Sequence, residues 1–218
     1  MGCLRVTLAS AGLGLCLASP ASGQAAGLVV RNAGVAQGVT LGVVYGRGRD
    51  PSSTGTSRSD AIGARALVGL GPIGISLGIA RTWLEPAGLT KVHRDELSAT
   101  AALTVFGGPL VPLKVAWQVG GSRSLGTDQA WRGSLGLGAA LVIPAALLSI
   151  RPWLAPRIDY LGHQTIQGSR VKPAFAAGIE FGLLTGLGVQ IEYDSRLGWD
   201  AGSGRVPGIG IGVSHHFR

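Results

Sequence analysis

One pattern constrains the fold of this chain more than any other: large apolar residues alternate with small ones over many short stretches. In "QGVTLGVVYG" the phase from Val39 to Tyr45 is large and apolar, while the other phase is mostly glycine. "IGISLGIARTW" repeats the pattern from Ile73 to Ile79. Successive side chains of a β-strand point to opposite faces, so strict alternation predicts strands with two unlike faces.

Ten segments carry this alternation, roughly 36–46, 60–70, 73–84, 96–106, 110–120, 131–143, 148–161, 173–183, 186–195 and 206–217. Their connectors alternate between short ones, such as "GP" and "LLTG", and long polar ones, such as "RGRDPSSTGTSRS". Each segment is long enough to cross a bilayer at a tilt. We predict an all-β fold over 36–218, a transmembrane up-and-down antiparallel β-barrel of ten strands. Eight strands is the alternative if the first segment and the last hairpin are excluded.

Charged residues in these segments fall on the phase opposite to the large apolar residues. Arg81 is an exception, placed beside Trp83 where a long side chain can reach lipid headgroups. If the apolar phase faces lipid, the other charges face a lumen and form a network of ion pairs, because unpaired burial is costly. The predicted lumen charge network is Arg65, Lys114, Arg132, Arg151, Arg157, Asp159, Glu180, Glu192 and Asp194.

Phase alone does not separate such a barrel from a soluble sandwich with its apolar face inside. Two features favour the barrel. The polar phase is dominated by Gly, Ala, Ser and Thr, which suits a narrow lumen better than a solvated surface. Aromatic residues also lie on the apolar phase near strand ends, as membrane interfaces require. The predicted interfacial aromatics are Tyr45, Trp83, Trp117, Trp131, Tyr160, Tyr193 and Phe217.

The first residues have the features of a secretory signal peptide. Arg5 is followed by an apolar run that is too short to span a bilayer. Small residues then offer cleavage after Gly23 or Ala25. A lipoprotein signal at "LGLC" is a weaker interpretation, because a bulky leucine precedes the cysteine. We therefore predict a signal peptide at 1–23 and a periplasmic lead-in at 24–35.

Composition narrows the function classes. Both cysteines, Cys3 and Cys16, lie in the leader, so the mature chain has no disulfide or thiolate metal site. The net charge of +8 is dispersed rather than clustered, which disfavours nucleic acid and suits anionic lipid headgroups. A helical membrane protein is a further alternative, since 133–150 is uncharged, but Pro144 interrupts that window.

With the leader, the ten segments and the terminal "GIGIGVSHHF", the chain resembles the small, monomeric bacterial outer-membrane β-barrels. The resemblance implies location in the bacterial outer membrane and a last strand that the barrel assembly machinery recognises. The residues of that signal would be Ile209, Ile211, Val213, His215 and Phe217. Arg218 departs from the pattern, because the aromatic residue usually ends the chain. The resemblance implies no particular activity.

Three motifs suggest chemistry, and each has a simpler explanation. His215 and His216 are adjacent in a predicted strand, so they face opposite sides and do not chelate one ion together. "GLGPIG" from Gly69 matches a dinucleotide motif, and "GISLG" around Ser76 matches a nucleophile elbow. Both motifs need a following helix, whereas a strand follows here. We predict no cofactor, no metal site and no catalytic residues.

Three functions are compatible with this reading. The favoured one is a non-enzymatic envelope protein with a structural or surface-interaction role and a largely filled lumen, since ten strands is close to the size that side chains fill. The alternative is a narrow, weakly anion-preferring pore. The third is an outer-rim protease or lipid-modifying enzyme using His93, Asp95, Asp128 or His163. Expected partners are outer-membrane lipid, lipopolysaccharide and the barrel assembly machinery, with a monomeric state and no nucleic acid.

Overall fold

The structure is a computed structural model that describes residues 38–52, 55–85, 92–107, 111–125, 131–145, 147–162, 170–197 and 205–217. The predicted signal peptide at 1–23, the lead-in at 24–35 and Arg218 lie outside these residues. No helix in the described ranges is long and apolar enough to cross a membrane.

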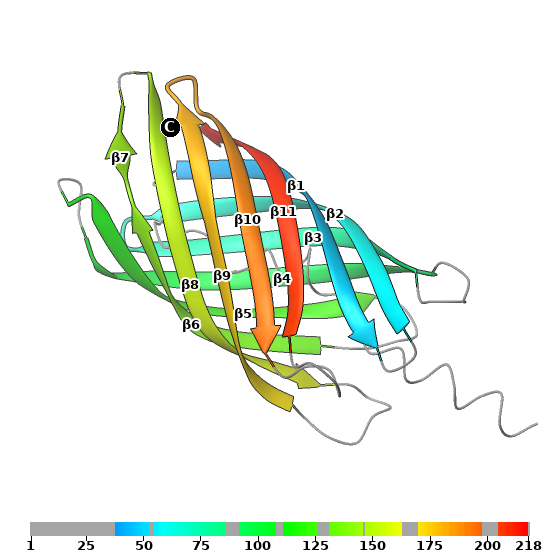
Figure 1. The fold of residues 1–218 in the computed structure, drawn as a ribbon. Helices are drawn as coiled ribbons and strands as arrows, with labels where there is room; N and C mark the ends of the chain where they lie inside the picture. The colour runs from blue at the N-terminus through cyan, green and yellow to red at the C-terminus, as the bar shows by residue number, and fades with distance from the viewer. Residues whose placement is uncertain are drawn as a thin grey trace, which may run out of the picture.

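The described residues form a closed antiparallel barrel (Figure 1). Its strands are β1 (Gly38–Ser52), β2 (Gly55–Leu70), β3 (Ile73–Glu85), β4 (Val92–Phe106), β5 (Leu113–Leu125), β6 (Trp131–Leu141), β7 (Ile143–Pro144), β8 (Leu148–Gly162), β9 (Arg170–Leu183), β10 (Leu187–Leu197) and β11 (Arg205–Phe217). Strands that follow one another in the chain pair, apart from β6 and β7, and β1 pairs with β11. The short β7 continues β6 beyond Val142, and both pair with β8. The predicted ten-stranded barrel is confirmed.

The two ends of the barrel differ, as the connector lengths predict. One end, here called the turn end, holds the tight connections and also Gly38 and Phe217. Gly71 and Gly186 adopt positive φ in two of those turns, at 61° and 87°, a conformation that glycine tolerates without steric cost. The opposite end, here called the loop end, holds the connections that follow Ser52, Glu85, Leu125, Gly162 and Leu197, none of which lies within the described residues.

The first hairpin is longer than the alternation predicts. We expected a polar loop from Arg47 onward, but β1 continues to Ser52 and pairs there with Gly55. Cross-strand polar contacts hold this extension, with Arg47 Nε 3.0 Å from Asp60 Oδ1 and the Tyr45 hydroxyl donating to Asp60 at 2.7 Å. Apolar alternation marks only the part of a strand that meets hydrocarbon, so it misses strand pairing that continues into water.

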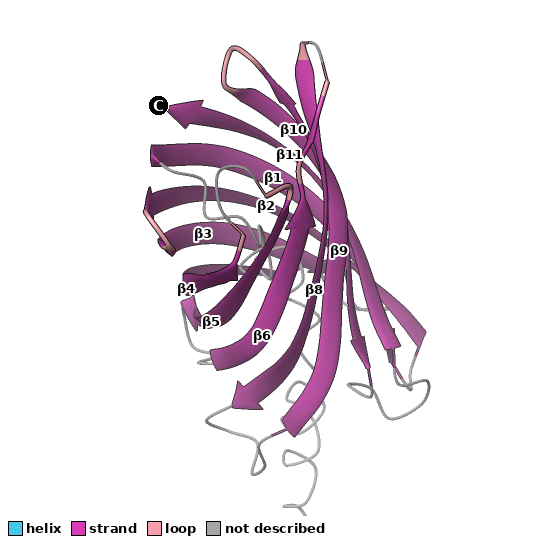
Figure 2. Cartoon of the chain, turned by 90° about the vertical axis from the view of Figure 1, so that its left-hand side faces the viewer, coloured by secondary structure: helices cyan, strands magenta, loops and turns pink. Residues whose placement is uncertain are grey.

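The barrel is apolar outside and polar inside (Figure 2 shows the wall that includes β5, β6, β8 and β9). Leu41, Leu77 and Ile191 are about half exposed, whereas Glu180 is 1% exposed. This arrangement is the reverse of a soluble protein, and it is what a membrane-spanning barrel requires. The one buried apolar cluster among the described residues lies inside and consists of Ala140, Trp153, Ala155 and Ala176.

Candidate functional site: the barrel lumen

The predicted lumen charges all lie on the inward phase of their strands. Arg132, Arg157, Asp159, Glu180, Glu192 and Asp194 are buried, and Arg65, Lys114 and Arg151 are half-buried. The barrel divides most of them into two groups at different depths, one near the turn end and one nearer the loop end.

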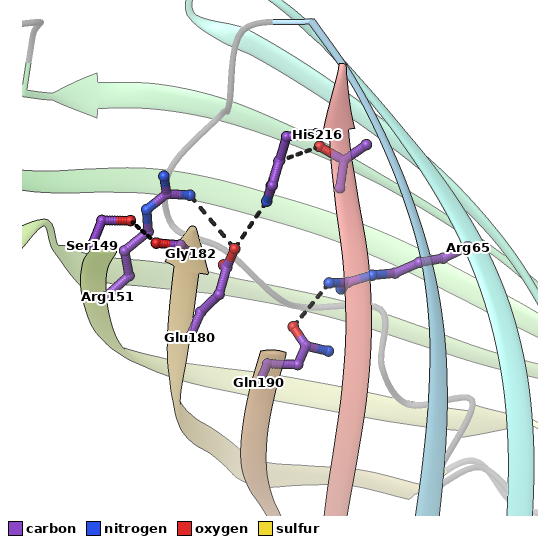
Figure 3. A network of polar contacts seen from close by, with 8 residues as sticks. Arg65, Ser149, Arg151, Glu180, Gly182, Gln190 and His216 are labelled. Carbon is purple, nitrogen blue, oxygen red and sulfur yellow. Dashed lines mark hydrogen bonds and ion pairs between the residues drawn. The ribbon is translucent and has the colours of Figure 1, made fainter. Parts of the chain in front are cut away.

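Glu180 is the centre of the turn-end group (Figure 3). Its Oε1 lies 2.9 Å from His216 Nε2 and 3.5 Å from Arg151 Nη1. The other ring nitrogen of His216, Nδ1, lies 2.8 Å from Thr40 Oγ1. The imidazole therefore links a hydroxyl on β1 to a carboxylate on β9, and β10 lies between β9 and the strand of the histidine.

Arg65 makes a second contact in the same region. Its Nη2 donates to Gln190 Oε1 at 3.0 Å, and Figure 3 shows the guanidinium extending from β2 toward β10. In the strand order, β1 and β11 separate these two strands. The contact therefore crosses part of the lumen rather than following its wall.

Arg157 is the centre of the second group. Its Nε donates to Asp159 Oδ1 at 2.9 Å, and its Nη2 lies 2.9 Å and 2.7 Å from the two carboxylate oxygens of Asp194. The side chains of Arg157 and Asp159 are at most 2% exposed. Charge-assisted contacts of this kind are among the stronger hydrogen bonds in proteins, so this group ties β8 to β10 across β9.

Several lumen glycines face large side chains at close range. A Cβ added to Gly178 would lie 2.6 Å from the ring of Trp153, and one added to Gly210 would lie 2.6 Å from Glu192 Oε1. Real Cβ atoms do not approach so closely. The frequent glycine of the small phase thus makes room for specific neighbours inside the barrel.

The sequence reasoning missed four inward-facing residues. Glu96 is buried on the inward phase of β4, which also carries Arg94, and Lys172 on β9 pairs in register with Asp159. Arg94 and Lys172 fall just before the predicted segments 96–106 and 173–183, because the apolar phase fades there. Trp153 lies inside the barrel rather than at a membrane interface. The sequence contains a signal for this position, because Trp153 is two residues from Arg151 and therefore shares its inward face.

The predicted interfacial aromatics lie on the outer phase. Trp131 packs against Tyr160 with ring centroids 4.8 Å apart, near the loop end. Trp117 and Phe217 are near the turn end. The remaining outward aromatics are Tyr45, Trp83 and Tyr193, and the structure adds Phe106, Phe175 and Phe181.

In the last strand the predicted assembly residues share the outer face. Ile209, Ile211 and Val213 are exposed, and the ring of His215 lies 4.4 Å from that of Phe217. His216 points inward to Glu180. The two adjacent histidines therefore have separate environments.

The residues considered for an outer-rim enzyme are not brought together in the part of the chain that is described. His93 and Asp95 lie on the outward phase of β4, and Asp95 accepts two hydrogen bonds from Arg81, at 2.7 Å and 2.8 Å. Asp128 and His163 lie outside the described residues. Within the described ranges, no three His, Cys, Asp or Glu residues gather as metal ligands.

Comparison with known proteins identifies the fold but no relative in sequence. No protein-family model and no curated protein sequence matches this chain. The structure is similar to the β domain of the Bordetella autotransporter BrkA, with a TM-score of 0.55, 13% identity, and coverage of 84% of this chain and 100% of that one. It is also similar to LpxR from Salmonella typhimurium, with a TM-score of 0.50, 8% identity, and coverage of 82% and 99%. The chain has the fold of bacterial outer-membrane β-barrels, in agreement with the predicted location.

Proposed function

We propose that this protein is an integral outer-membrane β-barrel with a structural or surface-interaction role, whose lumen is largely filled by its own polar side chains. The observation that carries this proposal is that lumen contacts pass over intervening strands. Arg157 reaches Asp194 across β9, and Arg65 reaches Gln190 across β1 and β11. Side chains that bond in this way occupy the cross-section of a narrow barrel.

The energetics of the lumen support the same proposal. A buried charge that loses its partner is strongly destabilising, so a solute that displaced Arg157 from its two carboxylates would meet a high barrier. The close fit of lumen glycines to large neighbours, such as Gly210 to Glu192, also leaves little space there. The lumen is therefore better suited to holding the barrel rigid than to transport.

The surface role would use the outer rim of the loop end. The side chains of Arg47 and Arg81 are 54% and 52% exposed on the outer face. Guanidinium groups bind phosphate well, so we propose that this rim contacts the phosphates of lipopolysaccharide and other lipids. The proposal includes a monomeric barrel that is inserted by the barrel assembly machinery through its last strand.

A narrow, weakly anion-preferring pore is the second candidate, and one observation favours it. Lys114 faces the lumen and makes no hydrogen bond or ion pair with any described residue. The inward-facing residues of β3 near the turn end are also small: they are Gly74, Ser76 and Gly78. A cation facing small side chains is what a narrow anion path would contain.

Single-channel conductance of the refolded mature chain in a planar bilayer tests the two candidates. A heat-modifiability gel first establishes that the inserted protein is folded. We expect no discrete conductance steps from the native chain, and steps from the triple variant Arg65→Ser, Arg157→Ser, His216→Ser. The matched control replaces three outward arginines instead, Arg47→Ser, Arg81→Ser and Arg123→Ser, and should stay silent. Anion-biased steps from the native chain would establish the pore and overturn the filled lumen.

A further inference from the structure

The pairing between β6–β7 and β8 is interrupted twice. Its register includes Gly136 opposite Arg157, then Ala139 and Ala140 opposite Leu154 and Trp153, then Ile143 opposite Ile150. Two stretches within this series are unpaired. Continuing the register places Leu137 opposite Pro156 in one and Leu141 opposite Pro152 in the other. A proline has no N–H to donate to a neighbouring strand. The carbonyls of Leu137 and Leu141 on β6 therefore receive no ladder hydrogen bond from β8.

The other long seams that flank this region do not share this defect. The register of β8 with β9 runs without a gap from Leu148 to Leu161, and that of β5 with β6 runs without a gap from Leu113 to Arg123. In hydrocarbon a backbone group that lacks a hydrogen-bond partner is strongly unfavourable. Separating β6 from β8 therefore breaks two hydrogen bonds fewer than separating an uninterrupted seam of the same length.

Apolar surface lies on both sides of this seam. On the outside, Leu135, Leu154 and Ile158 are exposed toward the hydrocarbon. On the inside, the apolar cluster that contains Ala140 and Trp153 lies directly on the two seam strands. Elsewhere the described lumen is lined mainly by polar and small residues. An acyl chain passing between β6 and β8 would meet apolar atoms on both faces.

Polar groups beside the cluster are suited to an anionic head. Trp153 is 5% exposed, and its ring Nε1–H has no hydrogen-bond partner. Lys114 lies opposite Ala140 on the neighbouring strand β5, faces inward and has no partner among the described residues. Arg151 lies two residues before Trp153 on the same face, and its Nε is also without a partner (Figure 3 shows its guanidinium near Glu180).

We propose that the barrel opens laterally between β6 and β8 to bind an anionic amphiphile. The acyl chain lies in the opened seam against Trp153, and the carboxylate or phosphate head lies in the lumen near Lys114 and Arg151. The indole N–H donates to an oxygen of the head. This route runs from the bilayer into the wall, so it requires no path along the barrel axis.

The test uses the mature chain with Trp153 as its single tryptophan, the other four being replaced by phenylalanine, in phosphatidylcholine bilayers. A bromine-substituted fatty acid quenches tryptophan fluorescence on contact. We expect saturable quenching of Trp153. The oxidised cysteine pair Ala139→Cys/Leu154→Cys closes the seam and should abolish quenching, and reduction should restore it. The matched pair Ile75→Cys/Ala101→Cys joins β3 to β4 at two residues that are opposite each other in the register. It should leave the quenching of Trp153 unchanged.

The head group is tested separately. Lys114→Gln should weaken the apparent affinity for the brominated fatty acid about tenfold, because it removes a hydrogen bond between two charged groups, which is stronger than a neutral one. The methyl ester of the same acid, which has no charged head, should bind to the native chain as weakly as the acid binds to the Lys114→Gln variant. Arg123→Gln, on the outer face, is the control and should leave the affinity unchanged. A brominated lysophosphatidic acid distinguishes a phosphate head from a carboxylate head. The proposal would be overturned if folded protein showed no quenching, or if quenching did not saturate. It would also be overturned if quenching persisted in the oxidised Ala139→Cys/Leu154→Cys variant or if Lys114→Gln left the affinity unchanged.

Discussion

The carboxylate of Glu180 lies 2.9 Å from the imidazole of His216, although β10 separates their two strands. The contact closes a chain of groups from Thr40 through His216 and Glu180 to Arg151, all near the turn end. Because Glu180 is almost completely buried, its charge depends on these neighbours.

Replacing His216 should therefore weaken the barrel. His216→Ala leaves Glu180 with Arg151 at 3.5 Å, and we expect a loss of about 1–3 kcal/mol in the free energy of unfolding, the usual cost of a buried acceptor that loses its donor. His215→Ala, which removes only an outward ring that packs on Phe217, should cost less. Denaturant unfolding in detergent micelles measures both. Equal losses in the two variants would contradict the structural role of His216.

Arg157 and Arg81 allow the effect of burial to be isolated. Both hold a carboxylate at 2.7 Å, but the side chain of Arg157 is 2% exposed and that of Arg81 is 52% exposed. Arg157→Ala removes the buried cation that Asp159 and Asp194 share and should cost about 3–5 kcal/mol. Arg81→Ala removes an exposed pair and should cost about 0–1 kcal/mol. The measurement is the same unfolding experiment, and similar values for the two variants would show that the Arg157 group is hydrated.

The lumen glycine Gly178 provides a test of packing, with the outward-facing Gly133 as its control. A Cβ at Gly178 would lie 2.6 Å from the ring of Trp153 and also 2.6 Å from a backbone oxygen of Ile191, whereas one at Gly133 would meet nothing within 4 Å. Gly178→Ala forces a shift in a packed site and should cost about 1–3 kcal/mol. Gly133→Ala should be neutral or slightly stabilising, because it restricts the unfolded chain. If both are neutral, the ring of Trp153 moves freely and the lumen is less filled than we propose.

The interrupted seam predicts where backbone amides exchange. Hydrogen–deuterium exchange of β6 should be faster than that of β9. Two β6 carbonyls receive no hydrogen bond from β8, so the seam opens at lower cost and exposes the β6 amides that donate across it. The double variant Pro152→Val/Pro156→Val restores both donors and should slow exchange in β6 several-fold.

Pro173→Val is the matched control for that experiment, since Pro173 on β9 keeps its pairing with Ile158. It should leave exchange in β6 unchanged. Unaltered exchange in the double variant would show that the seam is held by contacts other than its ladder.

Strand positions and side-chain direction were predictable because both are local. The alternation located all ten membrane-crossing segments within a few residues, and it separated outward residues such as Leu77 from inward ones such as Glu180. The prediction failed where the local signal ended. β1 and β2 continue beyond the apolar band because Arg47 and Asp60 pair across them, and charged pairs in a hairpin do not resemble a membrane strand.

The sequence by itself determined that this chain forms a barrel with an apolar outside and charges inside, because a period of two residues assigns each side chain to a face. Only the tertiary structure decided which charges meet. Arg157 binds Asp194 37 residues away, and Thr40 meets His216 176 residues away. Such partners are set by the register of strands that are distant in the chain and by the closure of the sheet. The same register places Pro152 and Pro156 opposite β6, where their missing N–H groups interrupt the ladder of hydrogen bonds between β6 and β8.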